Sequence, residues 1–135
     1  MTNPPIQSDA LAALRVQIDQ LDAELLRILN ARAKVAQEVG DIKRAEGSAF
    51  FRPDRVSQVI DKITQANAGP LKNEHVASIW REIMSACLAL EAPQRVAVLG
   101  PQGTFCEQAA IEFFGSTANL IYCANFDEVR VLAHV

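Results

Sequence analysis

The sequence has none of the features of a secreted, membrane-spanning or metal-binding protein. No stretch approaches the roughly 20 consecutive apolar residues that span a bilayer, and the N-terminus has neither the basic region nor the apolar run of a secretion signal. Three cysteines, Cys87, Cys106 and Cys123, are odd in number and widely spaced, so they suggest neither a disulfide framework nor a metal-ligand pair. We therefore expect reduced thiols, a cytoplasmic location and no bound metal.

An excess of positive charge is also absent. The 135 residues include 13 Lys and Arg against 16 Asp and Glu, which gives a formal net charge of −3. This balance gives no reason to expect nucleic acid or an anionic membrane as a partner. With 50% hydrophobic residues, the length fits one small domain plus a fragment of another. Any site for an anion has to be built locally, against the overall charge.

The first long segment predicts an extended amphipathic helix. Ser8 or Asp9 is a suitable N-cap, and from there to about Glu46 there is no proline and a single glycine, Gly40. Alternating steps of four and three residues mark a seam of the coiled-coil type, apolar at all positions but one. Its members are Leu14, Ile18, Leu21, Leu25, Ile28, Arg32, Val35, Val39 and Ile42.

The length of this helix predicts a dimer. At 1.5 Å per residue it extends about 55 Å, whereas a globule of about 100 residues has a radius of gyration near 13 Å. A rod of that length projects from its own globule and leaves its apolar seam exposed. The same helix of a partner chain can cover this seam, so we expect a homodimer.

Two shorter helices and then a change of pattern follow. A second helix is predicted from Pro53 towards Asn67, and a third, capped by Asn73, as far as Pro93. Residues 1–92 therefore predict an all-α domain. Residues 93–135 read instead as a short α/β stub, with strands at 95–99 and 120–123 and a helix from Glu107 to Phe114. This stub is too short to complete an α/β domain.

Arg32 occupies a seam position whose neighbours are all aliphatic. A buried guanidinium is costly unless an anion pairs with it. Lys43 follows eleven residues later on nearly the same face, about 16 Å along the axis, so both long side chains can close on a ligand between them. The alternative is an ion pair of Arg32 with Glu38 or with a glutamate of a partner chain.

Other candidate side chains carry weaker signals when taken singly. Arg15 lies about 25 Å from Arg32 along the rod, so it reaches the same ligand only from the partner chain of an antiparallel dimer; otherwise it is an ordinary surface arginine. Arg52 and Arg55 flank a helix start, where backbone N–H groups favour anions. Glu91 lies at the end of the third helix and is either a site residue or a solvated one.

Together these residues resemble a known family. The segments are Leu14-Arg15 to Lys43, Phe51 to Arg55, and Trp80 to Glu91, and they resemble the all-helical chorismate mutases, in particular the mutase domain of bifunctional chorismate mutase–prephenate dehydratases. The motif Leu99 to Phe105, with Glu107 to Ala110 after it, resembles the start of the dehydratase domain. The resemblance covers most of residues 10–92 and implies an intertwined helical dimer.

The resemblance also implies a reaction and a set of site residues. Arg15 comes from the partner chain, and the arginines hold the two carboxylates of chorismate. Lys43 and Glu91 donate hydrogen bonds to the ether oxygen of the breaking bond. The rearrangement to prephenate is an intramolecular Claisen reaction that needs no cofactor. The implied catalytic residues are Lys43, Glu91 and Arg32, and the implied substrate-binding residues are Arg15, Arg32, Lys43, Arg52, Arg55, Val56, Cys87 and Glu91.

The sequence departs from the family pattern at two of these positions. Val56 stands where a glutamate usually contacts the substrate hydroxyl, and Cys87 stands where serine or another small residue is common. We expect weakened rather than abolished catalysis. Because the dehydratase-like segment is short, we expect neither dehydratase activity nor feedback by phenylalanine.

Two alternatives compete with the mutase interpretation. Isochorismate pyruvate lyase uses the same fold and similar charges, although the dehydratase-like motif argues against it. A helical dimerisation module without catalysis is favoured by Val56 and by the short stub, and is opposed by the retained Arg15, Arg32, Lys43 and Arg55.

Overall fold

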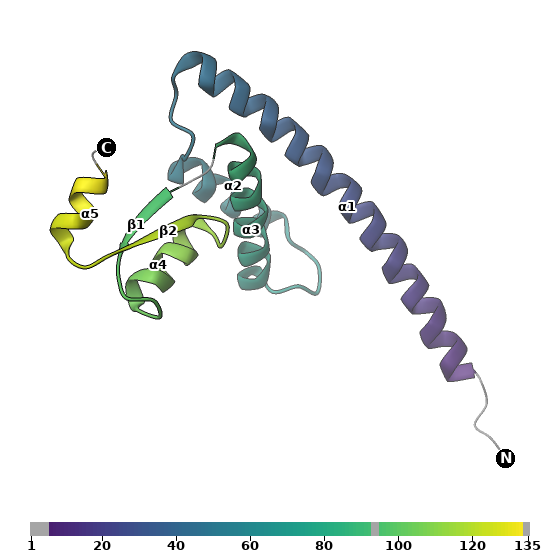
Figure 1. The fold of residues 1–135 in the computed structure, drawn as a ribbon. Helices are drawn as coiled ribbons and strands as arrows, with labels where there is room; N and C mark the ends of the chain where they lie inside the picture. Colours follow the sequence, from purple (N-terminus) through teal and green to yellow (C-terminus); the bar gives the residue numbers. More distant parts are fainter. Residues whose placement is uncertain (1–5, 93–94, 134–135) are drawn as a thin grey trace.

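The structure, a computed structural model, describes residues 6–92 and 95–133, which form three helices followed by a small α/β unit (Figure 1). The helices are α1 (Ile6–Glu46), α2 (Pro53–Ala66) and α3 (Asn73–Glu91). The predicted fold class, a long helix and two shorter ones before an α/β stub, is confirmed. The predicted end of the third helix at Pro93 lies outside the described residues.

The ends of α1 show which local signals operate. The helix ends at Glu46 because Gly47 adopts a φ of 72°, the left-handed conformation that glycine tolerates, and Ser48 N donates to Lys43 O at 3.0 Å. Its start at Ile6 shows that the prediction of a cap at Ser8 or Asp9 was wrong. Asp9 instead lies in the first turn, where a carboxylate interacts favourably with the helix dipole.

The connection between α2 and α3 differs from the prediction at the N-cap of α3. Pro53 begins α2 as expected for a residue without an N–H. Lys72 is the N-cap of α3, so the prediction of Asn73 as its cap was wrong. The Asn73 side chain instead accepts a hydrogen bond from Asn67 Nδ2 at 2.8 Å, and the same amide donates to Leu71 O at 2.7 Å. These bonds hold the turn that sets α2 and α3 beside each other.

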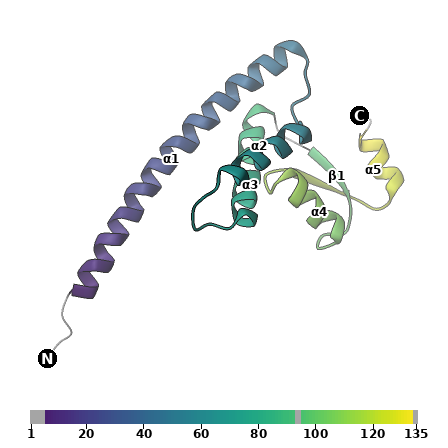
Figure 2. The same cartoon turned by 180° about the vertical axis from the view of Figure 1, so that it is seen from behind.

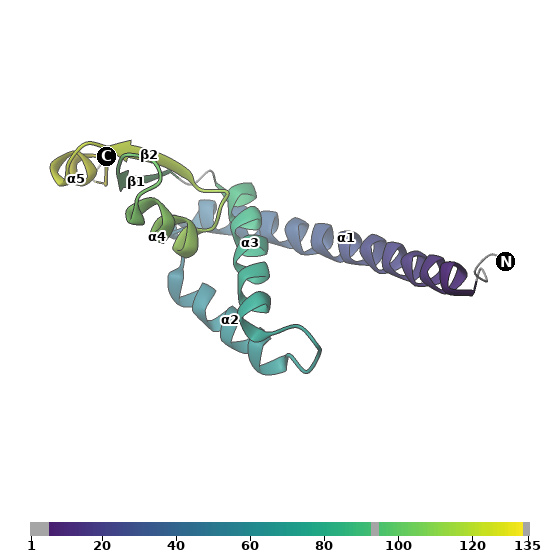
Figure 3. The same ribbon diagram turned by 90° about the horizontal axis from the view of Figure 1, so that it is seen from below.

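The two halves of α1 differ in their surroundings. The packed half, residues 29–46, lies against α3, which also packs on α2. The projecting half, residues 6–28, runs away from the rest of the molecule in all three views (Figures 1, 2 and 3). Its large apolar side chains are exposed: Leu11, Leu14, Val16, Ile18, Leu21, Leu25, Leu26 and Ile28.

The α/β segment is a parallel strand pair with two helices. β1 (Arg95–Leu99) pairs with β2 (Asn119–Cys123), and α4 (Phe105–Phe114) lies between them in sequence. α4 ends at Phe114 as predicted, but it begins two residues before the predicted start at Glu107. A last helix, α5 (Phe126–Ala133), was not predicted. α4 contacts α3, so the segment is docked on the helical part.

The chain alone has a thin core. Its buried apolar side chains are few: Ile60, Val76, Cys87, Val98, Ala110 and Cys123. Among the described residues, no large side chain is completely buried. Within the same residues, no helix is both long and apolar enough to cross a membrane.

Candidate active site

A cavity of about 440 Å³ lies where the packed half of α1 meets α2, α3 and the end of α4. This volume falls within the range of small-molecule sites, roughly 300–1,000 Å³. Seven of the eight predicted binding residues line it: Arg32, Lys43, Arg52, Arg55, Val56, Cys87 and Glu91. They come from three helices and one loop, so the fold brings together residues far apart in sequence.

Lys43 and Glu91 form the polar centre of one wall. Lys43 Nζ lies 3.2 Å from Glu91 Oε2, and the side chains are 21% and 10% exposed. Lys43 Nζ also donates to Phe50 O at 2.9 Å. Helices α1 and α3 approach closely here because Gly40 of α1 has no side chain. A Cβ on Gly40 would lie 3.1 Å from Glu91 Cα on α3. Gly40 therefore places Glu91 within reach of Lys43.

Arg32 lines the same cavity and lies nearer than Lys43 to the N-terminus of α1. Its guanidinium donates to Cys87 Sγ at 3.2 Å, and Cys87 is buried on α3. A thiol is a weak acceptor and carries no compensating charge. None of the ion pairs among the described residues joins Arg32 to Glu38, the alternative partner within the chain. The guanidinium charge therefore remains available to an anionic ligand.

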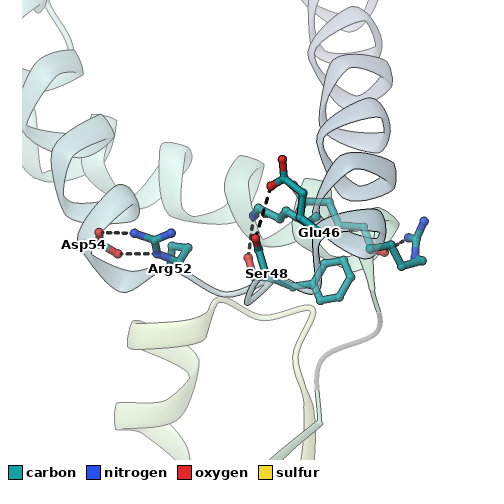
Figure 4. A network of polar contacts seen from close by, with 8 residues as sticks. Glu46, Ser48, Arg52 and Asp54 are labelled. Carbon is teal, nitrogen blue, oxygen red and sulfur yellow. Dashed lines mark hydrogen bonds and ion pairs between the residues drawn. The ribbon is translucent and has the colours of Figure 1, made fainter.

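Arg52 and Arg55 lie at the start of α2, on the side of the cavity that is open to solvent. Arg52 makes a two-pronged contact with Asp54, at 3.2 and 3.0 Å (Figure 4). The hydrogen bond from Arg52 lowers the pKa of the Asp54 carboxyl, and the hydrogen bond with Asp54 raises the pKa of Arg52. Both side chains are more than half exposed, so the pair contributes little to stability.

Arg15 is the predicted site residue that the cavity does not contain. It lies on the projecting half of α1, exposed and remote from the cavity lining. Its own chain therefore gives it no route to the site, as expected from its distance along the rod.

The lining also includes residues that the sequence analysis did not assign to the site, among them Arg81 on α3, and Phe113 and Phe114 at the end of α4. Arg81 lies in the Trp80–Ile83 segment of the resemblance, but no spacing rule singled it out. Phe113 and Phe114 belong to the stub, and nothing in their sequence indicates contact with the first three helices. Their places in the lining depend on how distant parts of the chain pack together, which the sequence alone does not show.

The charge of the lining decides what the cavity can hold. It has five cationic side chains, from Arg32, Lys43, Arg52, Arg55 and Arg81, and one carboxylate, from Glu91. The whole chain has a net charge of −3, so this concentration of cations is local. In the part of the chain that the structure describes, no group of three His, Cys, Asp or Glu side chains could hold a metal ion. Lys43 pairs with Glu91 and Arg52 with Asp54, so Arg32, Arg55 and Arg81 leave a local positive charge. The lining suits a small organic anion, held by charge-assisted hydrogen bonds.

Comparisons with known proteins agree on one family. The model of chorismate mutase type II matches residues 14–92. A bifunctional chorismate mutase/prephenate dehydratase of Stutzerimonas stutzeri is 48% identical over 91% of this chain and 35% of its own length. The protein of the same description from Pseudomonas aeruginosa is 48% identical over 90% of this chain and 34% of its own. The chain thus spans about a third of the length of these relatives.

A solved structure extends the similarity to three dimensions. Chorismate mutase (form II) from Thermus thermophilus superposes with a TM-score of 0.60 at 32% identity. The superposition covers 61% of this chain and 93% of that protein. The shared part is therefore nearly the whole of the Thermus chain and somewhat more than half of this one.

Proposed function

The chain belongs to the chorismate mutase type II family, and from that premise we propose that it rearranges chorismate to prephenate in the cavity between α1, α2 and α3. The observation that carries the proposal is the lining of five cations and one carboxylate. Chorismate is a dianion, and its two carboxylates require paired cations. Its rearrangement needs no nucleophile and no cofactor, so a site made only of positioning and hydrogen-bonding groups suffices.

The lining supports two contributions to the rate. Arg32 and Arg55 hold the carboxylates, so the substrate stays in the compact conformer that reacts. Lys43, and Glu91 when protonated, donate hydrogen bonds to the ether oxygen, where negative charge develops as the C–O bond breaks. Arg52, Val56 and Cys87 complete the substrate contacts. Arg81 is a further cation that can balance a carboxylate.

The same site needs a second chain. The protein exposes 10180 Å², whereas a compact monomer of 14.7 kDa exposes roughly 6,900 Å². The difference is enough to supply an obligate dimer interface, which buries about 2,000–5,000 Å² in total. The exposed seam on the projecting half supplies part of this surface. A homodimer that pairs these halves antiparallel supplies Arg15 to the partner's cavity.

The remaining assignments follow from the same premise. We place the mutase domain at residues 1–92, since the family match ends at residue 92, and treat 93–135 as a separate dehydratase-like segment. A cytoplasmic location suits a chain whose three cysteines are all free thiols.

The test is an assay of the purified full chain with chorismate, followed by loss of chorismate absorbance and chromatographic detection of prephenate. Arg32→Ala should lose activity, whereas Arg27→Ala should keep it, because Arg27 pairs with Glu24 on the exposed face of the same helix. Release of pyruvate from isochorismate instead would assign the chain as a lyase. Inactivity on both substrates would leave a dimerisation module.

A further inference from the structure

Three aromatic rings join the α/β segment to the loop before α2. Phe51 lies in that loop, and Phe113 and Phe114 are the last two residues of α4. The ring centroid of Phe51 is 5.6 Å from that of Phe113 and 4.7 Å from that of Phe114. All three rings line the cavity. Contacts of this kind stabilise a fold beyond the effect of the area that they bury.

The end of α4 is fixed to α3 by specific polar contacts. Thr117 Oγ1 donates to Ser85 O at 2.9 Å, and Ser116 N donates to Glu82 Oε1 at 3.1 Å. Gly115, which directly follows α4, is buried and has a φ of 86°. The space that a Cβ would take at this position is filled by the Ser85 side chain. A glycine is required both by the backbone conformation and by the close approach. The docking of α4 is thus a built contact.

The aromatic cluster leads directly to Lys43. The carbonyl of Phe50, the residue before Phe51, accepts a hydrogen bond from Lys43 Nζ at 2.9 Å. The same ammonium group contacts Glu91 Oε2 at 3.2 Å. The direction of Lys43 Nζ therefore depends on where the loop places the Phe50 carbonyl, and the loop is held by Phe51 between the α4 rings.

We propose that Phe113 and Phe114 are positioning residues for mutase catalysis: by clamping Phe51, they hold the Phe50 carbonyl that orients Lys43. The α/β segment is then part of the mutase site, although it lies outside the family match. This inference rests on the proposed function, because it concerns the rate of the same reaction.

Phe113 has a second role in the same wall. It lines the cavity and also a neighbouring groove between α2, α3 and α4. Phe51, Val56 and Arg81 line both spaces as well, so Phe113 belongs to the boundary between them.

The experiment measures kcat and KM of the full chain and of Phe113→Ala/Phe114→Ala. A catalytic donor misplaced by about 1 Å can cost about 100-fold, and we expect kcat to fall about tenfold. KM should change less than about threefold, because the contact of Lys43 with the ether oxygen strengthens only in the transition state. Phe113→Leu/Phe114→Leu, which refills most of the volume, should recover most of the loss. Phe105→Ala and Phe126→Ala are matched controls, since both rings are exposed.

The outcomes separate this inference from the function beneath it. A wild-type chain that does not convert chorismate overturns the proposed function and the inference together. An active wild type with an unchanged kcat in the double alanine variant overturns the inference alone. If that variant loses helical circular dichroism, Thr117→Val decides, because it removes only the anchor on Ser85 and no cavity residue. An unchanged kcat in Thr117→Val would then overturn the proposal, and a fall of about threefold would support it.

Discussion

The two halves of α1 carry one continuous seam but have opposite surroundings. In the packed half, Arg32 and Lys43 reach α3 and line a cavity. In the projecting half, Leu21 is 67% exposed and Leu25 is 53% exposed, and the seam residues Val35 and Ile42 of the packed half are also exposed. The pattern therefore places polar site residues against α3 in one half and leaves an apolar stripe exposed along the whole helix.

A regular apolar pattern in a sequence does not show whether that face packs within its own chain or against a partner chain. The packed half finds its partner, α3, within the chain. Within the described residues, the projecting half has no such neighbour, and its apolar side chains favour association because burying each of them contributes about 1.5–3 kcal/mol. In the proposed homodimer a partner copy covers this stripe and supplies Arg15 across the interface.

The largest effect is expected from a charge in the projecting half. Leu21→Glu places two carboxylates in a symmetric interface, and at about 2 kcal/mol each this raises the dimer dissociation constant about 1,000-fold. Mutase activity should fall with the dimer. Sedimentation and the chorismate assay measure the two effects together.

The control for this variant is Ala23→Glu, which lies on the opposite face of the same helix, about 180° from the seam. It should leave both the assembly and the activity unchanged. A dimeric, active Leu21→Glu protein would show that the seam is not the interface.

A second variant breaks the packed half instead. Gly40→Val forces a branched side chain against the Glu91 backbone, which already lies at the contact limit. Overpacking of this kind costs about 1–3 kcal/mol, so the melting temperature and the activity should both fall while the dimer persists. Ala45→Val on the exposed side of α1 is the control. A Gly40→Val protein as stable as its control would mean that α1 and α3 separate without penalty.

Local signals predicted most helix bounds, such as the start of α2 at Pro53 and the end of α1 near Glu46, although the caps predicted at Ser8 or Asp9 and at Asn73 were wrong. Sequence reasoning failed where contacts between distant elements decide: Phe113 meets Phe51 across 62 residues, and no periodicity indicates that contact. α5 was missed because its eight residues carry too short a pattern to distinguish a helix from a loop.

The predicted site residues also differ in whether local sequence or packing between distant elements reveals them. Arg32 was recognised because a charge interrupts an aliphatic series, and Lys43 because helical geometry returns it to the same face. The pairing of Glu91 with Lys43 depends on the helix crossing at Gly40, which a single sequence does not reveal. The weak thiol partner of Arg32 was likewise not foreseen, because Cys87 was assigned a contact with the substrate and none with Arg32.

Val56→Glu tests a smaller contribution on the cavity wall. The resemblance implies that a glutamate here contacts the substrate hydroxyl, so the variant should lower KM by an amount worth about 1–2 kcal/mol at most, because burying a carboxylate has its own cost. Steady-state kinetics on chorismate measure it, with Val59→Glu, a neighbouring lining position on α2, as the control. Unchanged or poorer kinetics in a folded Val56→Glu protein would mean that the site is adapted to valine.

The smallest effect is expected at Glu91. An ionised carboxylate only accepts hydrogen bonds, so Glu91 donates to the ether oxygen only while it carries a proton. Glu91→Gln keeps the shape of the side chain and supplies a permanent donor. It should raise kcat/KM for chorismate, measured by steady-state kinetics, by the ~0.5–1.5 kcal/mol of one hydrogen bond.

Glu38→Gln, at an exposed glutamate on α1, should leave kcat/KM unchanged. A folded Glu91→Gln protein that is no more active than wild type would mean that Glu91 does not contact the ether oxygen.

The central claim is that each cavity is completed by Arg15 of a second chain, and mixed dimers test it most directly. Arg15→Ala and Arg32→Ala proteins, each nearly inactive alone, are unfolded, mixed in equal amounts and refolded. A mixed dimer then has one site with both arginines and one site with neither. Random pairing in a two-fold dimer predicts recovery of about a quarter of the activity of wild type refolded in the same way. A mixture that stays as inactive as its parents, while wild type recovers, would contradict the shared site.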